Sequence, residues 1–132
     1  MMIVGRHVIA DLSGCPPELL LDEDWLNKTF SEALGRVGAT VITLSSYKFP
    51  GEGGVTGLFL LSESHASYHT YPEYTYIAID IFTCGSCDPE QALEFVSRQL
   101  KANVWECKSL RRQIPSSSAA WTPASSGTVC NL

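Results

Sequence analysis

The stretch YTYIAIDIF, residues 74–82, gives the clearest indication of the fold class. Branched side chains occupy alternate positions in it, namely Thr75, Ile77, Ile79 and Ile81. A period of two residues is typical of a β-strand whose faces meet different surroundings, because successive side chains point to opposite sides of a sheet. We therefore predict a strand over residues 74–82.

Five further strands and two helices are predicted around this segment. The strands span residues 3–12, 39–49, 55–62, 65–71 and 104–110. Asp22 is suited to begin the first helix, and Gly38 is suited to end it. Asp88 followed by Pro89 is a typical start for the second helix. Apolar residues at helical spacing give each helix one stripe that can be buried.

The order β-α-β-β-β-β-α-β determines the architecture that we expect. Helices with one apolar face each are expected to cover the same side of the sheet. We predict an α+β fold, a two-layer α/β sandwich with a mostly antiparallel sheet and two helices on one face. We expect residues 1–114 to form a single domain, and residues 115–132, which carry no charged side chain, to form a disordered tail.

Composition excludes several classes of protein. Nine lysines and arginines against fourteen acidic residues give a net charge of -5, so we expect no nucleic-acid partner. The longest apolar run is too short to span a bilayer, and we expect no membrane partner. Arg6 and His7 interrupt the apolar N-terminal stretch, which argues against a signal peptide. The expected location is the cytoplasm.

The five cysteines favour free thiols over disulfides, because their number is odd and no export signal is apparent. Cys84-Gly-Ser-Cys87 has the C-x-x-C spacing of zinc and redox sites. It lacks a second pair at finger spacing and a thioredoxin-like context. We therefore predict no metal site. A serine-hydrolase elbow, G-x-S-x-G, is absent from the sequence.

The stretch LSESHASYHTYPEY, residues 61–74, connects two apolar runs without the Gly, Asn or Asp that a hairpin turn favours. It offers instead a carboxylate, hydroxyls and two imidazoles, from Glu63, Ser64, His65 and His69. One hypothesis for this set is self-processing, in which Ser64 attacks the carbonyl of Glu63.

Several motifs resemble those of the S-adenosylmethionine decarboxylase proenzyme family, of the short prokaryotic, pyruvoyl-dependent type. They are E-S-H at residues 63–65, H-T-x-P-E-Y at 69–74, F-T-C-G at 82–85, Gly5-Arg6-His7 and Gly38-Ala39-Thr40. The similarity covers about residues 3–110. It implies a two-layer α/β sandwich that assembles as a homodimer of cleaved protomers. It also implies decarboxylation of S-adenosylmethionine for polyamine (spermidine) synthesis.

The resemblance assigns roles to individual residues. The zymogen would cut itself between Glu63 and Ser64, and Ser64 would become a pyruvoyl group that forms a Schiff base with the substrate amine. His69 matches the base of processing, and Cys84 matches the proton donor of decarboxylation. Thr56 stands where the family has a serine, and its hydroxyl is expected to assist processing.

Substrate residues follow from the same resemblance. Phe49 would stack on adenine and Glu73 would hold the ribose hydroxyls. The chain departs from the family pattern near this pocket, with Tyr71 in place of Trp and an extra acid, Glu52, in a longer loop. A decarboxylase of arginine or ornithine is therefore an alternative, in which Glu52 or Glu73 meets the distal cation.

A non-catalytic homologue that partners a processed relative is the second alternative, and the intact residues Glu63, Ser64, His69 and Cys84 argue against it. Structural roles are expected for His7, His65, Cys87 and Cys107.

Overall fold

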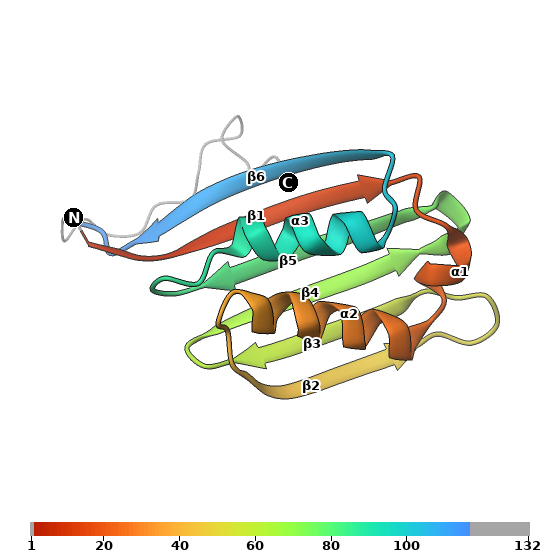
Figure 1. The fold of residues 1–132 in the computed structure, drawn as a ribbon, viewed down its shortest axis with the longest axis horizontal. Coiled ribbons are helices and arrows are strands. Elements are labelled where there is room, and N and C mark those ends of the chain that lie inside the picture. Colours follow the sequence, from red (N-terminus) through yellow and green to blue (C-terminus); the bar gives the residue numbers. More distant parts are fainter. Residues whose placement is uncertain (1, 117–132) are drawn as a thin grey trace.

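A computed structural model describes residues 2–116 of the chain (Figure 1). Six strands form one sheet in the order β2-β3-β4-β5-β1-β6, and each neighbouring pair is antiparallel. The strands are β1 (Ile3–Ser13), β2 (Val41–Lys48), β3 (Val55–Leu61), β4 (Ser64–Tyr71), β5 (Tyr76–Thr83) and β6 (Val104–Gln113). Residues 117–132, most of the predicted tail, lie outside the described residues.

The helical elements cover one side of this sheet. They are α1 (Pro17–Leu20), α2 (Glu23–Arg36) and α3 (Pro89–Gln99), with a 3-10 turn, η1 (Pro72–Tyr74), between β4 and β5. The two long helices, α2 and α3, lie side by side on the same face (Figure 1). The predicted fold class, a two-layer α+β sandwich, is confirmed.

Helix starts follow the capping residues seen in the sequence. The Asp22 carboxylate accepts a hydrogen bond from the backbone N–H of Trp25 at 3.0 Å. Asp88 accepts from the backbone N–H groups of Glu90 and Gln91 at 2.9 and 3.4 Å. Each cap satisfies N–H groups that have no partner inside the helix, and so fixes where the helix begins.

Several element bounds differ from the prediction, and three of the differences have a clear local cause. Strand β5 begins at Tyr76, two residues late, because η1 includes Tyr74 and Thr75 has a left-handed backbone with φ 51°. Strand β6 continues to Gln113, since it pairs with β1 along its whole length. The one-turn helix α1 was not expected, because a four-residue segment is too short to show helical periodicity.

The core between helices and sheet is built around three aromatic rings. Phe30 of α2 stacks on Tyr68 of β4 with ring centroids 4.6 Å apart, and Phe59 of β3 lies beside both. The Tyr68 hydroxyl donates to Oδ1 of Asn27 at 2.6 Å. The ring has room only because residue 57 is glycine, where a Cβ would lie 2.2 Å from a Tyr68 ring carbon.

The other face of the sheet carries no helix among the described residues. Apolar side chains are exposed on it at Tyr47, Leu58 and Leu60, with 54–58% of each residue accessible to solvent. We call this face the open face of the sheet.

Two ends of the sheet can be distinguished (Figure 1). One end holds the β3–β4 turn and the β5–α3 loop, and the opposite end holds the β2–β3 loop and η1.

Replacing Gly57 with alanine should destabilise the fold. The added Cβ would overlap the ring of Tyr68, which stacking and its hydrogen bond hold in place, so we expect a loss of about 1–3 kcal/mol in the free energy of unfolding. Chemical denaturation measures this. Gly35→Ala is the matched control, because a Cβ at Gly35 in α2 meets nothing within 4 Å. It should be neutral or stabilising by about 0.5 kcal/mol. Equal losses in both variants would contradict this packing account.

Candidate active site

The β3–β4 turn is a two-residue hairpin with an unusual residue in it. Leu61 pairs directly with Ser64, so Ser62 and Glu63 make the whole connection. Glu63 has φ 63°, in the left-handed region that glycine or asparagine normally occupies. A side chain in this conformation costs of order 1 kcal/mol or more and often marks a functional site.

Two predicted catalytic groups meet at this turn. The Cys84 thiol donates a hydrogen bond to the carbonyl oxygen of Glu63, with the two atoms 3.1 Å apart. The Ser64 hydroxyl donates to the carbonyl oxygen of Ser62 at 3.2 Å. Strands β4 and β5 are neighbours, which brings the start of one next to the end of the other. The predicted nucleophile, the predicted scissile carbonyl and the predicted proton donor therefore lie together.

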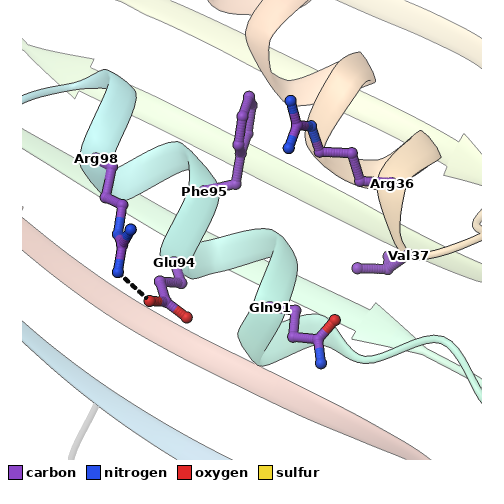
Figure 2. Close-up of a pocket in the computed structure, with 6 residues that line it drawn as sticks. All are labelled: Arg36, Val37, Gln91, Glu94, Phe95 and Arg98. Atoms are coloured by element: carbon purple, nitrogen blue, oxygen red, sulfur yellow. Dashed lines mark hydrogen bonds and ion pairs between the residues drawn. The ribbon is translucent and has the colours of Figure 1, made fainter.

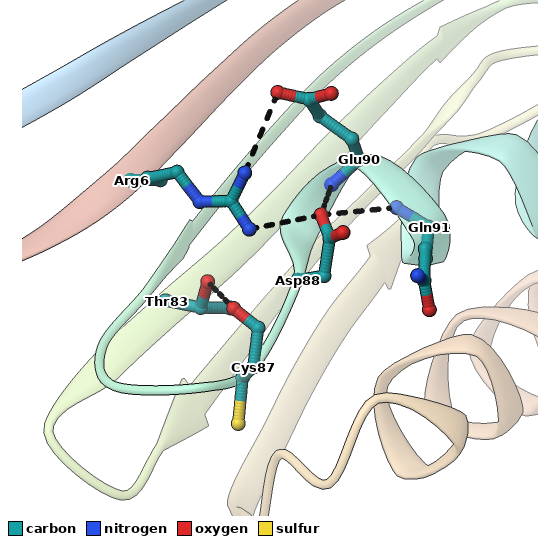
Figure 3. A network of polar contacts seen from close by, with 6 residues as sticks. All are labelled: Arg6, Thr83, Cys87, Asp88, Glu90 and Gln91. Atoms are coloured by element: carbon teal, nitrogen blue, oxygen red, sulfur yellow. Dashed lines mark hydrogen bonds and ion pairs between the residues drawn. The ribbon is translucent and has the colours of Figure 1, made fainter.

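Polar contacts hold the β5–α3 loop, which carries Cys84, at the end where it enters α3 (Figure 3). The Thr83 hydroxyl donates to the carbonyl oxygen of Cys87 at 2.8 Å. Arg6 of β1 makes ion pairs with Asp88 at 3.2 Å and with Glu90 at 3.8 Å. Since Asp88 also caps α3, the loop is anchored to a strand and to a helix.

The cysteines of the C-x-x-C motif have different surroundings. The sulfur of Cys84 contacts the Glu63 carbonyl, whereas the sulfur of Cys87 lies 3.9 Å from where a Cβ would stand at Gly38, after α2. Both thiols are free and partly exposed. This arrangement favours separate roles for the two residues over a shared zinc or dithiol site.

A second group of predicted residues gathers around His69. Thr56 and His69 face each other on adjacent strands, and the Thr56 hydroxyl is hydrogen-bonded to Nδ1 of His69. The Tyr71 ring meets the imidazole edge-on at 4.5 Å between centroids, and the Phe49 ring does so at 6.0 Å. We call Phe49, Thr56, His69 and Tyr71 the His69 group.

A hollow of about 520 Å³ adjoins the His69 group on the open face of the sheet. Polar residues that line it include Asp11, Thr56, Ser67, Tyr76 and Asp80. The Tyr76 hydroxyl donates to a carboxylate oxygen of Asp11. Burial, together with this hydrogen bond, raises the pKa of Tyr76 from its ordinary value near 10 to about 12.

The two predicted acids of the substrate site, Glu52 and Glu73, are both exposed at the end of the sheet that holds the β2–β3 loop and η1. Glu73 belongs to η1, and Glu52 belongs to the β2–β3 loop, which ends on a hydrogen bond from the Phe49 N–H to the carbonyl oxygen of Gly54. Both connections lie opposite the β3–β4 turn (Figure 1).

Ser64 and His69 are far apart in this chain. Both belong to β4, and five residues of strand at roughly 3.3 Å each separate their Cα atoms by about 17 Å. Because side chains alternate along a strand, the two also point to opposite faces of the sheet. Within one chain, the His69 imidazole cannot reach the Ser64 α-proton.

A second hollow, of about 580 Å³, lies on the helix layer between α2 and α3 (Figure 2). Arg36 lies over the Phe95 ring at 4.1 Å and pairs with Glu32, and Arg98 pairs with Glu94. Its arginines are thus already matched by acids of their own helices. The predicted catalytic residues are absent from its lining.

Sequence reasoning missed a polar network on the open face of the sheet, where His7, Ser67 and Asp80 line the same hollow as His69. Asp80 lies 2.7 Å from Nε2 of His7 and 3.5 Å from Nε2 of His65, and it accepts a hydrogen bond from the Ser67 hydroxyl. Alternation along β4 does place His65, Ser67 and His69 on one face. His7, which contacts Asp80, lies 73 residues before it in the sequence, so spacing could not reveal this contact.

The comparisons with known proteins agree on one family. A family model described as S-adenosylmethionine decarboxylase matches residues 6–113. An S-adenosylmethionine decarboxylase proenzyme of Parasynechococcus marenigrum is 44% identical over 118 residues, which cover 89% of this chain and 91% of the relative. That of Geobacillus kaustophilus is 40% identical over 112 residues, 85% and 90% of the two chains.

A solved structure extends this agreement to the fold. The crystal structure of the adenosylmethionine decarboxylase from Aquifex aeolicus superimposes with a TM-score of 0.79 at 27% identity, covering 92% of this chain and all of that one. None of the helices within residues 2–116 combines the length and the apolar character that a membrane span requires. The predicted resemblance is confirmed, and the chain belongs to the S-adenosylmethionine decarboxylase family.

Proposed function

We propose that this chain is a self-processing, pyruvoyl-dependent decarboxylase that acts on S-adenosylmethionine in polyamine synthesis. The observation that carries the proposal is the Cys84 thiol on the Glu63 carbonyl, in a strained turn beside Ser64. Relatives named S-adenosylmethionine decarboxylase proenzyme support both the cleavage and the substrate. We further propose that residues 1–114 act as one domain and that the enzyme works in the cytoplasm.

Cleavage begins with attack of the Ser64 hydroxyl oxygen on the Glu63 carbonyl carbon, which moves the acyl group from nitrogen to oxygen. Negative charge then develops on the oxygen that the Cys84 thiol already contacts, and a donor placed there stabilises it. A base removes the α-proton of residue 64, and the ester C–O bond breaks. The resulting dehydroalanine takes up water and releases ammonia, leaving a pyruvoyl group on the chain 64–132.

A carbonyl at residue 64 suits the decarboxylation. The pyruvoyl group supplies an electron sink for the carbanion that decarboxylation creates, a task beyond ordinary side chains. Cys84 lies against the neighbouring carbonyl and can deliver a proton to substrate carbon. A thiol fits this role because it titrates nearer to neutrality than a hydroxyl does. Cys84 therefore serves first in processing and then in turnover.

The base of processing comes from a second copy of the chain in this proposal. His69 is about 17 Å from Ser64 along its own strand, and it points to the open face. The same face exposes Tyr47, Leu58 and Leu60, which a second sheet would cover. We propose a homodimer in which the β3–β4 turn of one protomer meets the His69 group of its partner.

Substrate binding would use that same shared site. Phe49, which is 42% exposed, offers an aromatic ring to adenine, and Glu73 offers acceptors to ribose hydroxyls. The Thr56 hydroxyl holds the His69 ring and thereby assists processing. If the substrate is arginine or ornithine instead, Glu52 or Glu73 would meet the distal cation.

The purified protein should release CO2 from S-adenosylmethionine and leave arginine and ornithine unchanged. Mass spectrometry under denaturing conditions should find two fragments that meet between Glu63 and Ser64, the second without a free N-terminal amine. Ser64→Ala should remain one chain and release no CO2. Release of CO2 from arginine or ornithine, and not from S-adenosylmethionine, would show that the substrate belongs to the alternative class. An intact wild-type chain that decarboxylates would overturn the self-processing mechanism.

Co-expression of Ser64→Ala with His69→Ala chains tests the shared site. In a mixed dimer, Ser64 of the His69→Ala chain meets the intact His69 of its partner. Random pairing in a twofold dimer should therefore leave about half of the His69→Ala chains cleaved. Each variant expressed alone should stay uncleaved. Failure of the mixture to cleave, in chains shown to associate, would return the base to the same chain or to another residue.

Glu63→Gly should relax the β3–β4 turn, because glycine adopts positive φ without a steric penalty. In a Ser64→Ala background, we expect the free energy of unfolding to rise by about 0.5–1 kcal/mol. With Ser64 present, cleavage should slow by about two- to fivefold if the strain is released on the way to the transition state. Ser62→Gly is the control, since Ser62 has no positive φ, and it should not stabilise. Equal effects of the two changes would argue against stored strain.

A further inference from the structure

The polar network on the open face of the sheet follows from strand register. His7 of β1 and His65 of β4 both pair with Phe82 of β5, one on each side. Asp80 lies two residues before Phe82 and so shares its face of the sheet. Its Oδ2 atom is 2.7 Å from Nε2 of His7 and 3.5 Å from Nε2 of His65. Two imidazoles and a carboxylate from three strands therefore converge on the open face of the sheet, and one of the imidazoles belongs to His65, the residue that follows Ser64.

Proton positions in this network can be deduced. An Arg112 nitrogen lies 3.2 Å from Nδ1 of His7, and a guanidinium can only donate. Nδ1 of His7 therefore accepts, and Nε2 carries the proton that is donated to Asp80. The Ser67 hydroxyl donates to the other oxygen of Asp80. The Asp80 carboxylate therefore accepts hydrogen bonds from His7 and from Ser67, and its Oδ2 atom also lies 3.5 Å from Nε2 of His65.

A metal ion is the competing occupant of this cluster. The ligand atoms of His7, His65 and Asp80 all lie within 4.8 Å of one another. A cation on Nε2 of His7 would require the proton on Nδ1, which then needs an acceptor as its second partner. Arg112 offers only donors there. The network is better described as hydrogen bonds from His7 and Ser67 to Asp80, with Nε2 of His65 3.5 Å from the same carboxylate.

His65 is held by more than this carboxylate. Its ring meets the rings of His7 and Phe82 edge-on, each with centroids 5.6 Å apart. Its side chain is nevertheless 52% exposed, so these contacts orient the ring without burying it. The fixed side chain follows directly after the predicted cleavage point.

Self-cleavage changes what holds residue 64 in place. In the uncut chain, peptide bonds fix it on both sides. After the cut it is the end of a chain, and the ends of strands fray unless tertiary contacts hold them. His65 is the next residue, and its contacts with Asp80 and Phe82 are the first side-chain ties beyond the new terminus.

We propose that His65, oriented by Asp80, is a positioning residue for decarboxylation. It holds the new chain terminus so that the group derived from Ser64 stays beside Cys84. The inference rests on the proposed self-cleavage and extends it to the cleaved enzyme. It predicts a role in turnover and little effect on the cut itself, because residue 64 is still bonded on both sides at that stage.

His65→Ala should cleave normally, yet its kcat should fall by about ten- to a hundredfold with little change in KM, as expected for a misplaced reacting group. If the terminus is displaced, the proton should more often reach the carbon derived from residue 64 instead of substrate carbon. Hydrolysis of the imine would then release the substrate-derived part as an aldehyde and leave its nitrogen on residue 64 as the amine of alanine. N-terminal sequencing should then find more alanine at residue 64 after turnover than in wild type. His65→Gln, which keeps an N–H donor for Asp80, should recover most of the activity. Glu94→Gln, which breaks an exposed ion pair on α3, is the control and should resemble wild type.

The outcomes separate this inference from the proposed function. Cleaved His65→Ala with wild-type kcat and no added terminal alanine would overturn the inference while leaving the proposed function intact. Failure of wild type to cleave would overturn both. Loss of cleavage in folded His65→Ala would assign the residue to processing instead. Stoichiometric zinc in wild type that disappears in His65→Ala would identify the cluster of His7, His65 and Asp80 as a metal site and overturn the inference. If the alanine variant does not fold, Asp80→Asn should reproduce the kcat loss, and an unchanged kcat there would contradict the inference.

Discussion

The register of strand β4 is the constraint on which the rest of the site depends. It begins at Ser64, beside the strained turn, and reaches His69 five residues later. A strand cannot shorten that distance, and its alternation points the two side chains to opposite faces. One protomer therefore holds the proposed nucleophile and the Cys84 thiol at one end of the sheet, and the His69 group towards the other. The proposed mechanism uses both, which is the physical argument for a second copy.

At the β3–β4 turn, a backbone strain and a hydrogen bond act on the same peptide. Glu63 has an unfavourable φ, and the Cys84 thiol polarises its carbonyl. Two-residue hairpin turns favour glycine or asparagine at a position of positive φ, so a glutamate at residue 63 makes the turn less stable than glycine would. The anchoring of the Cys84 loop through Arg6 and Asp88 keeps the thiol in reach (Figure 3). The turn is therefore least favourable for stability at the Glu63–Ser64 peptide bond, which is the bond that we expect to be cleaved.

Much of this structure is predictable from the sequence, for identifiable reasons. The alternation in residues 74–82 and the caps at Asp22 and Asp88 specify a covered sheet and two helix starts. The elements that were missed, α1 and η1, are single turns with no periodicity to detect. The motifs predicted related roles for Ser64, as the precursor of the pyruvoyl group, and Cys84, as the proton donor. Their contact through the Glu63 carbonyl, and the network that joins His7 to Asp80 across 73 residues of sequence, depend on strand order and could not be read from spacing.

A crystal structure of the Ser64→Ala chain in its solution assembly tests the central claim most directly. The quantity to measure is the distance from Cα of residue 64 to each His69 imidazole in the assembly. The account predicts that the imidazole of the partner protomer approaches this atom within hydrogen-bonding reach of its proton, while the same-chain Cα separation stays at about 17 Å. An assembly that leaves every His69 remote from residue 64, or a rearranged β4 that brings the same-chain imidazole close, would contradict it.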